Sequence, residues 1–174
     1  GGDSAPPNFN AVLVIADGMG GHAAGEVASQ ITVDGIMQLL SNRSSETACI
    51  GGAKLEDFLI NLLSEINQDV WTLGRNPENR DMGTTCTFAG IRNNRMSIAH
   101  IGDSRAYLYR NSHLTQITTD HSWVEEAIVG NRLSREEARG HPNRNVITRA
   151  IGISPECLID TFTIPLLEGD LILL

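Results

Sequence analysis

The sequence predicts an α+β fold, because helical and strand patterns occupy different parts of the chain. Residues 25–40 and 54–73 carry apolar side chains three or four positions apart, which is the period of an amphipathic helix. The second half of the chain instead has short runs of alternating apolar and polar residues separated by turn residues, as antiparallel strands do. The 174 residues suffice for one domain with a substantial core, so we expect a single domain over residues 1–174.

The most informative stretch begins with an apolar run at residues 12–16, which predicts a buried strand. Asp17 and Gly18 follow it, and three more glycines come before residue 26. A carboxylate at the rim of a sheet suits a hard divalent cation, and glycines let backbone carbonyls or phosphate oxygens approach closely. A metal or phosphate site and a plain strand–loop–helix turn both remain open. A hairpin is less favoured, because the residues after Gly18 do not alternate.

The two helices are expected to pack on a sheet and to be joined by a loop at residues 41–52. We assign Trp71, near the end of the second helix, to the core. Residues 1–10 are polar and rich in turn formers, which predicts a loop or linker. A second polar loop is expected at residues 75–82.

The rest of the chain predicts β-structure with short helices. We expect a continuous antiparallel meander, followed by two later strands, at residues 84–92, 95–101, 104–110, 113–118, 157–164 and 171–174. Asn93-Asn94 and Asn111-Ser112 are expected to form its tight turns. Asp103 interrupts this run, so a second carboxylate lies at the end of a strand.

Two short helices are expected after this β-region. Asp120 or Ser122 is a suitable N-cap for a helix over residues 123–130, and that role alone would account for Asp120. Ser134 and Glu137 have the spacing of a capping box at the start of the second helix.

The composition of the chain narrows the classes of partner and the compartment that we expect for the protein. A formal net charge of −8 argues against nucleic acid and against an anionic membrane surface as partners. Cys49, Cys86 and Cys157 are odd in number and widely spaced, which disfavours zinc and favours a reducing compartment. The sequence has neither a signal-peptide pattern nor an apolar run of membrane-spanning length, so we expect a soluble, cytoplasmic protein.

Five separated segments resemble one family. They are VLVIADGMGGHAAGEVAS at residues 12–29, MGTT at 82–85, HIGDSRAYLYR at 100–110, LTQITTDHSWV at 114–124 and HPNRNVITRAIG at 141–152. In this order they resemble the metal-dependent protein phosphatases, the PPM or protein phosphatase 2C type, and most closely their bacterial branch. The resemblance implies a four-layer α-β-β-α sandwich, in which two antiparallel sheets are flanked by helix pairs.

The resemblance also implies a chemistry. Family members hold two Mn²⁺ or Mg²⁺ ions, and bacterial members a third, at one end of the sandwich. Such ions lower the pKa of a bridging water, and the hydroxide attacks the phosphorus of phosphoserine or phosphothreonine. Asp17 matches the aspartate that bridges both metals, and the carbonyl of Gly18 matches a further ligand. Asp103 matches a ligand of the third metal.

Other residues receive expected roles from the same resemblance. His22 is a candidate for proton transfer, although a solvent-facing loop histidine is an equal alternative. Residues 120–145, beginning with Asp120, His121 and Ser122, correspond to the flap beside the site, where substrates are selected. We expect Arg105 to be a structural ion-pair partner and His100 to lie in the core or at its rim.

The chain also departs from the family pattern. Family members begin with a strand that bears a phosphate-binding arginine, whereas no arginine here precedes Arg43. They also continue beyond the strand that matches residues 171–174, with further aspartate ligands. The chain therefore looks truncated at both ends, and we expect residues 12–15 and 171–174 to expose apolar edges that promote self-association.

Two functions remain open at this point. One is a protein serine/threonine phosphatase acting on phosphorylated proteins, with a Ser/Thr kinase among the partners that the resemblance suggests. The other is a non-catalytic, phosphatase-like binding or regulatory module, or an inactive fragment.

Overall fold

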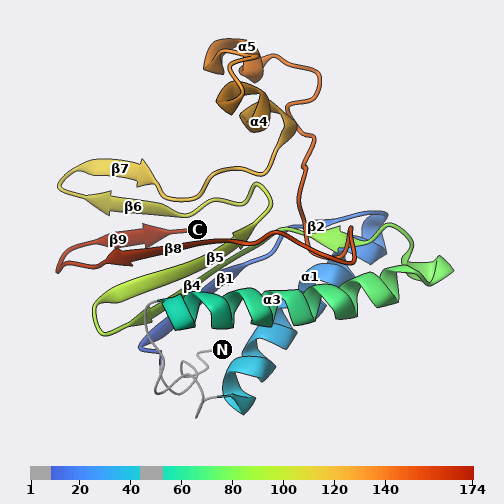
Figure 1. Cartoon of the computed structure of the whole chain (residues 1–174), viewed down its shortest axis with the longest axis horizontal. Coiled ribbons are helices and arrows are strands. Elements are labelled where there is room, and N and C mark those ends of the chain that lie inside the picture. The colour runs from blue at the N-terminus through green and yellow to red at the C-terminus, as the bar shows by residue number, and fades with distance from the viewer. Residues whose placement is uncertain (1–8, 44–52) are drawn as a thin grey trace.

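Two antiparallel sheets form the centre of the structure (Figure 1). The computed structural model describes residues 9–43 and 53–174. The larger sheet has the order β1-β4-β5-β8, with strands Ala11–Ile15, Cys86–Arg92, Arg95–Ile101 and Asp160–Pro165. The smaller sheet has the order β7-β6-β9, with strands His113–Gln116, Tyr107–Arg110 and Leu171–Leu173. A short ribbon pairs β2 (Gly18–Met19) with β3 (Gly83–Thr84).

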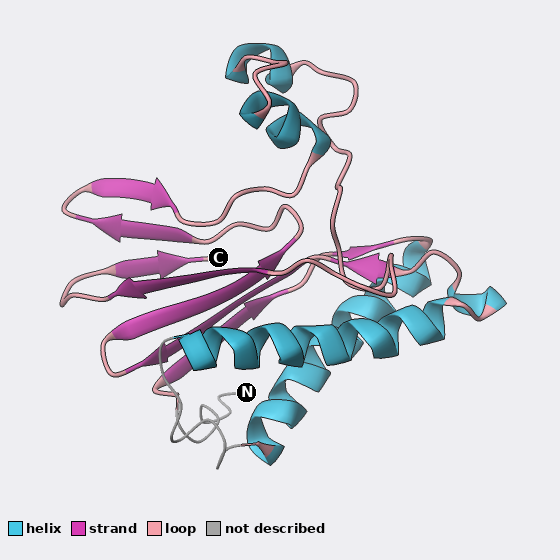
Figure 2. Ribbon diagram, in the orientation of Figure 1, coloured by secondary structure: helices cyan, strands magenta, loops and turns pink. Residues whose placement is uncertain are grey.

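Two long helices cover one face of the larger sheet. They are α1 (His22–Asn42) and α3 (Ala53–Gly74), and Figure 2 shows α1 crossing α3 at an angle beneath the strands. Both expected helices are therefore confirmed, although α1 begins three residues earlier than the periodicity predicts, at His22 instead of residue 25. None of the described helices is long and apolar enough to cross a membrane.

The core is divided between the two faces of the larger sheet. Successive residues of a strand point to opposite faces, so Phe88 and its partner Ala99 pack with the helices, whereas Ala89 and its partner Ile98 face the smaller sheet. The helix pair and the two sheets make three of the four expected layers. Within residues 9–43 and 53–174, no helix pair forms a fourth layer over the smaller sheet.

The expected continuous meander is wrong. β5 pairs with β4 and β8 in the larger sheet, whereas β6 pairs with β7 and β9 in the smaller one. The chain crosses between the sheets in the segment 102–106, where Gly102 adopts a φ of +111°. Alternating polarity identifies a strand but not the sheet to which it belongs, and for this reason the pattern missed the crossing.

The expected tight turns are confirmed. Asn93 and Asn94 have φ values of 50° and 56°, and Asn111 and Ser112 have 51° and 62°. These left-handed conformations suit the two-residue hairpins that join β4 to β5 and β6 to β7. Residues 146–151 form only isolated bridges, such as that between Ile151 and Thr84, and no longer strand.

Trp71 does not lie in the core. Its side chain is half-buried and lines a surface pocket of about 350 Å³ together with Arg75, Arg80 and Met82. Trp71 lies one turn from the end of α3, and helical periodicity cannot show which turns of a helix another element will cover.

Apolar strand edges are exposed, as expected. Among the described residues, β1 lies at one edge of the larger sheet and β9 at one edge of the smaller sheet. Leu13 and Ile15 of β1, and Leu171 and Leu173 of β9, are all exposed. Self-association through these edges stays a prediction.

Candidate metal centre

Asp17 follows β1, and Thr85 holds its backbone on both sides. The N–H of Asp17 donates to Oγ1 of Thr85 at 3.0 Å, and the N–H of Thr85 donates to the carbonyl of Asp17 at 3.0 Å. The side chain of Asp17 remains exposed. The loop therefore presents its carboxylate from a backbone that is fixed to the larger sheet.

The same threonine connects Asp17 to the loop that carries Asp103. The Thr85 hydroxyl, which accepts from the N–H of Asp17, also shares a hydrogen bond of 2.7 Å with Oγ of Ser104. Gly102 packs against Thr85 so closely that an added Cβ would lie 2.6 Å from the threonine side chain. The Asp17 loop and the Asp103 loop are thus held together at one end of the sheets, although they lie 86 residues apart in the sequence.

The glycines after Asp17 allow the start of α1 to pack directly on β2. A Cβ added to Gly18 would lie 2.0 Å from the carbonyl oxygen of Gly25, and one added to Gly25 would lie 2.8 Å from the carbonyl carbon of Gly18. Any side chain at either position would push the helix away from the Asp17 loop. The glycine spacing thus serves a close backbone contact.

Negative charge gathers around Asp103. Burial raises the pKa of its carboxyl group, and the nearby carboxylates of Asp120 and Asp17 raise it further, against the opposing effect of its own backbone N–H and of Arg105. A carboxylate that is partly buried beside other carboxylates is costly to ionise unless a cation neutralises it. The electrostatics therefore favour a cation near Asp103.

Asp17, Asp103 and the Gly18 carbonyl offer hard oxygen atoms, the ligands that Mg²⁺ and Mn²⁺ prefer. The type of donor fits such ions, but the number is small. Among the described residues, no group of three or more His, Cys, Asp and Glu side chains is placed to hold a metal. His22 opens α1, but its side chain lies outside what the structure describes, and its role stays a prediction.

The flap (residues 120–145) carries α4 (Trp123–Val129) and α5 (Arg135–Arg139), which project away from the sheets in Figure 1. Ser122 caps α4 by accepting a hydrogen bond from the N–H of Glu125 at 3.3 Å. The expected capping box of Ser134 at the start of α5 is present. The sequence therefore encodes both helix starts locally.

Asp120 pairs with Arg105 and is not the N-cap. Nε of Arg105 donates to Oδ1 of Asp120 at 2.8 Å, and Nη2 donates to Oδ2 at 2.6 Å. This carboxylate raises the pKa of the Arg105 guanidinium. The expected ion-pair role of Arg105 is confirmed, and Arg105 holds Asp120 at the edge of the flap.

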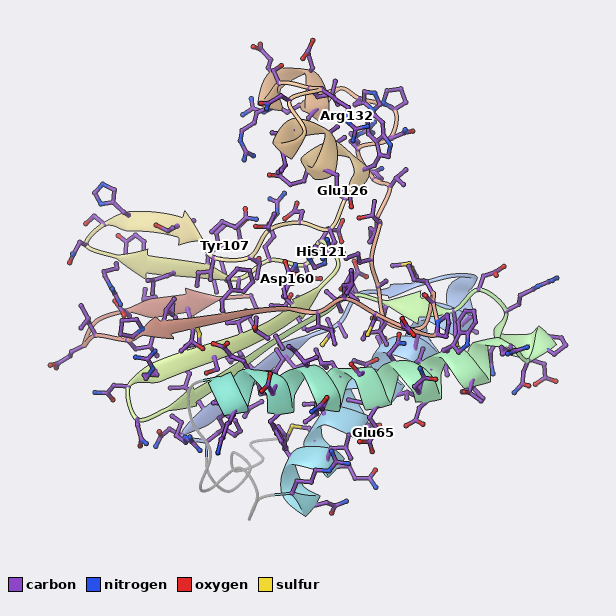
Figure 3. The ribbon with its side chains drawn as sticks, viewed as in Figure 1. Glu65, Tyr107, His121, Glu126, Arg132 and Asp160 are labelled. Atoms are coloured by element: carbon purple, nitrogen blue, oxygen red, sulfur yellow. The ribbon has the colours of Figure 1, made fainter. Side chains whose placement is uncertain are left out.

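His121 and His100 are buried where the flap meets the sheets. His100 lies in the core, as expected, and its ring centroid is 4.8 Å from that of His121. His121 contacts Asp160, the first residue of β8 (Figure 3). Asp160 also contacts Arg149. Sequence reasoning missed Asp160 and Arg149, because no local pattern connects them to a histidine 39 or 28 positions away.

Comparison with known proteins agrees with this architecture. The sequence pattern described as "Protein phosphatase 2C" matches residues 4–127. "Serine/threonine phosphatase stp" of Listeria monocytogenes is 37% identical over 165 residues, which cover 94% of this chain and 64% of that protein. The chain thus spans somewhat less than two thirds of the length of this curated relative.

Solved structures extend the comparison. The serine/threonine phosphatase of S. agalactiae has a TM-score of 0.86 at 33% identity, covering 92% of this chain and 65% of that chain. The catalytic domain of serine threonine protein phosphatase PstP, solved in complex with 2 manganese ions, has a TM-score of 0.74 at 33% identity and covers 92% and 64% of the two chains.

The two packed sheets with their helix pair match the folds of these serine/threonine phosphatases. The chain belongs to the protein phosphatase 2C family. The resemblance stated from the five sequence segments and the α+β fold that it implied are both confirmed.

Proposed function

We propose that the complete protein is a metal-dependent protein serine/threonine phosphatase, which hydrolyses phosphoserine and phosphothreonine with a metal-activated water. The observation that carries this proposal is the connection of the Asp17 and Asp103 loops through Thr85 and Ser104. A protein without need of paired carboxylates would gain little from holding them together, since burial and then the repulsion by Asp120 and Asp17 raise the pKa of Asp103.

Asp17, the Gly18 carbonyl and Asp103 are the residues of this chain that would hold Mn²⁺ or Mg²⁺. When bound, such ions lower the pKa of a coordinated water and neutralise phosphoryl oxygens. The chain's own contribution is orientation. Thr85 holds the backbone of Asp17 from both sides, and Arg105 keeps the carboxylate of Asp120 paired, so that Asp17 and Asp103 are the carboxylates left to bind cations.

The flap is the proposed site of substrate selection, with Asp120, His121 and Ser122 at its base. Phosphorylated proteins are the proposed substrates, and a partnering Ser/Thr kinase is among them. Cys86 and Cys157 are free thiols, in line with the reducing cytoplasm as the proposed compartment. We expect the 174-residue chain by itself to be a poor phosphatase, since Mg²⁺ demands six oxygen ligands and residues 9–43 and 53–174 bring few of them together.

The test is phosphate release from a phosphothreonine peptide by the complete protein, with Mn²⁺ and with the metal removed by a chelator. Hydrolysis should require the metal and should be lost in Asp17→Asn, which removes a charge with little change in volume. Asp69→Asn is the matched control, because Asp69 is exposed on α3, far along the chain from both loops. Equal turnover in Asp17→Asn and Asp69→Asn would contradict the proposal.

A further inference from the structure

His121 holds Gly102, the residue before Asp103, at two points. The backbone N–H of His121 donates to the carbonyl of Gly102 at 2.7 Å. The N–H of Gly102 donates in return to Nδ1 of the His121 ring at 3.1 Å. His121 is only 4% exposed, and an added Cβ at Gly102 would meet Thr85, so neither partner has room to move without the other.

The far side of the His121 ring is also held. Because Nδ1 accepts from Gly102, the ring proton of the neutral histidine lies on Nε2 and is donated to Oδ2 of Asp160 at 3.1 Å. Oδ1 of Asp160 accepts from Nη1 of Arg149 at 3.2 Å. Figure 3 shows His121 and Asp160 pointing toward one another where the flap meets the sheets. The orientation of the ring is therefore determined from both nitrogens.

Both ends of the flap meet at this histidine. The carbonyl of His121 accepts from the N–H of Thr148 at 2.9 Å, and the N–H of Trp123 donates to the carbonyl of Val146 at 2.9 Å. The carbonyl of Thr119, just before the flap, lies 3.1 Å from Nε2 of His100 in β5. His121 thus stands between the outgoing and returning segments of the flap and the larger sheet.

We infer that His121 is a positioning residue that couples the flap to the Asp103 loop. The inference rests on the proposed function, in which Asp103 is a metal ligand. A shift of the flap base must either carry Gly102 with it or break the bond to Nδ1, so the position of the flap and that of the Asp103 carboxylate change together. A cation held at Asp103 would in turn restrain the flap, since linkage between two sites is reciprocal.

Two substitutions of His121 distinguish the role of Nδ1 from that of Nε2. The side-chain oxygen of His121→Asn occupies the place of Nδ1 and retains an acceptor for Gly102, but it loses the contact with Asp160. The amide of His121→Gln occupies the place of Nε2 and retains the contact with Asp160, but it leaves the N–H of Gly102 without its acceptor. His113→Gln on the exposed strand β7 is the control for a histidine replacement in general.

The measurements are amide hydrogen exchange in the complete protein with and without Mn²⁺, and calorimetric titration with Mn²⁺ beside an Asp103→Ala variant. We expect His121→Gln to accelerate exchange at Gly102 and to weaken the Asp103-dependent Mn²⁺ site about tenfold, as loss of a ligand-orienting partner typically does. Mn²⁺ should slow exchange in α4 of the flap in the unaltered protein and in His121→Asn, but not in His121→Gln.

Equal rates of amide exchange at Gly102 in His121→Asn and His121→Gln would overturn the inference, because the contact through Nδ1 would then have no separate role. Equal Mn²⁺ binding by the unaltered protein and Asp103→Ala would overturn the metal role of Asp103, and with it the coupling to a bound cation. The exchange rate at Gly102 needs neither metal nor turnover, so the two failures are distinguished.

Discussion

Thr85 and Ser104 share a hydrogen bond of 2.7 Å between their hydroxyl groups, and this bond joins the two acidic loops of the structure. Thr85 belongs structurally to the Asp17 loop through two backbone contacts, and Ser104 follows Asp103 directly. The relative position of the two carboxylates therefore depends on a pair of small hydroxyl side chains that carry no charge themselves.

Thr85→Val should separate the loops, because valine has the shape of threonine but lacks the hydroxyl that bonds to the N–H of Asp17 and to Ser104, although its backbone N–H still donates to the carbonyl of Asp17. Loss of these bonds at a buried position should lower the free energy of unfolding by about 1–3 kcal/mol. Metal-dependent turnover of the complete protein should fall by more than the folded fraction does. Urea unfolding and peptide hydrolysis measure the two effects, and Thr115→Val, at an exposed position of β7, is the control. Retention of full turnover would show that the bond to Ser104 does not position the carboxylates.

Gly102→Ala should damage the Asp103 loop. The φ of +111° is unfavourable for alanine, at a cost of roughly 1–3 kcal/mol, and the new Cβ would also lie 2.6 Å from Thr85. Gly140→Ala is a matched control, since a Cβ there meets nothing within 4 Å. Thermal unfolding should show a much lower melting temperature for Gly102→Ala and little change in melting temperature for Gly140→Ala. Similar melting temperatures for both would mean that the loop can relax around the added methyl group.

Stability should fall in mild acid because of His100. Burial, together with the neighbouring His121, lowers its pKa from 6.5 to about 4. The unfolded chain therefore binds a proton between pH 6.5 and 4 that the folded protein does not, so stability is full above this range and is lost as the pH falls through it. The loss between about pH 7.5 and pH 5 should be roughly 2 kcal/mol.

Urea unfolding at these two pH values measures the effect. His100→Gln, which does not titrate, should lose correspondingly less stability on acidification than the unaltered protein. His113→Gln should behave like the unaltered protein, since His113 is exposed. A pH dependence that is the same in all three proteins would contradict the assignment to His100.

The sequence predicted what is local. Helices, hairpin turns and the capping box at Ser134 depend on residues a few positions apart, so spacing was enough to find them. The division of the strands between two sheets depends on pairings such as that of Ala99 with Thr161, far apart in the chain. No pattern in either strand records its partner.

At the candidate site, too, local sequence patterns identified residues but not their distant partners. Asp17 and Asp103 stood out because a carboxylate ends each strand and the flanking segments resemble a family. The contacts that hold them were not predictable, since Thr85 meets Asp17 across 68 positions and His121 meets Asp160 across 39. The assignment of Trp71 to the core was wrong for a related reason, because the burial of a side chain depends on where the neighbouring elements end.

The 174-residue chain should self-associate in solution. Leu13 on β1 and Leu171 on β9 are exposed on edge strands of their sheets among the described residues, and such edges invite pairing. Light scattering should give a molecular mass that rises with concentration, and the double substitution Leu13→Lys with Leu171→Lys should lower it. Leu158→Lys, at a still more exposed position outside the strands, is the control. A monodisperse monomer at all concentrations would contradict the prediction.

The most direct test of the account is a calorimetric Mn²⁺ titration of the complete protein and of Asp17→Asn, followed by phosphopeptide hydrolysis on the same samples. If Asp17 bridges two ions, the substitution should weaken both metal sites together and abolish hydrolysis while the thermal unfolding curve keeps its cooperativity. Near-normal hydrolysis by Asp17→Asn at saturating Mn²⁺ would contradict the account, because the chemistry would then not depend on the carboxylate that Thr85 holds in place.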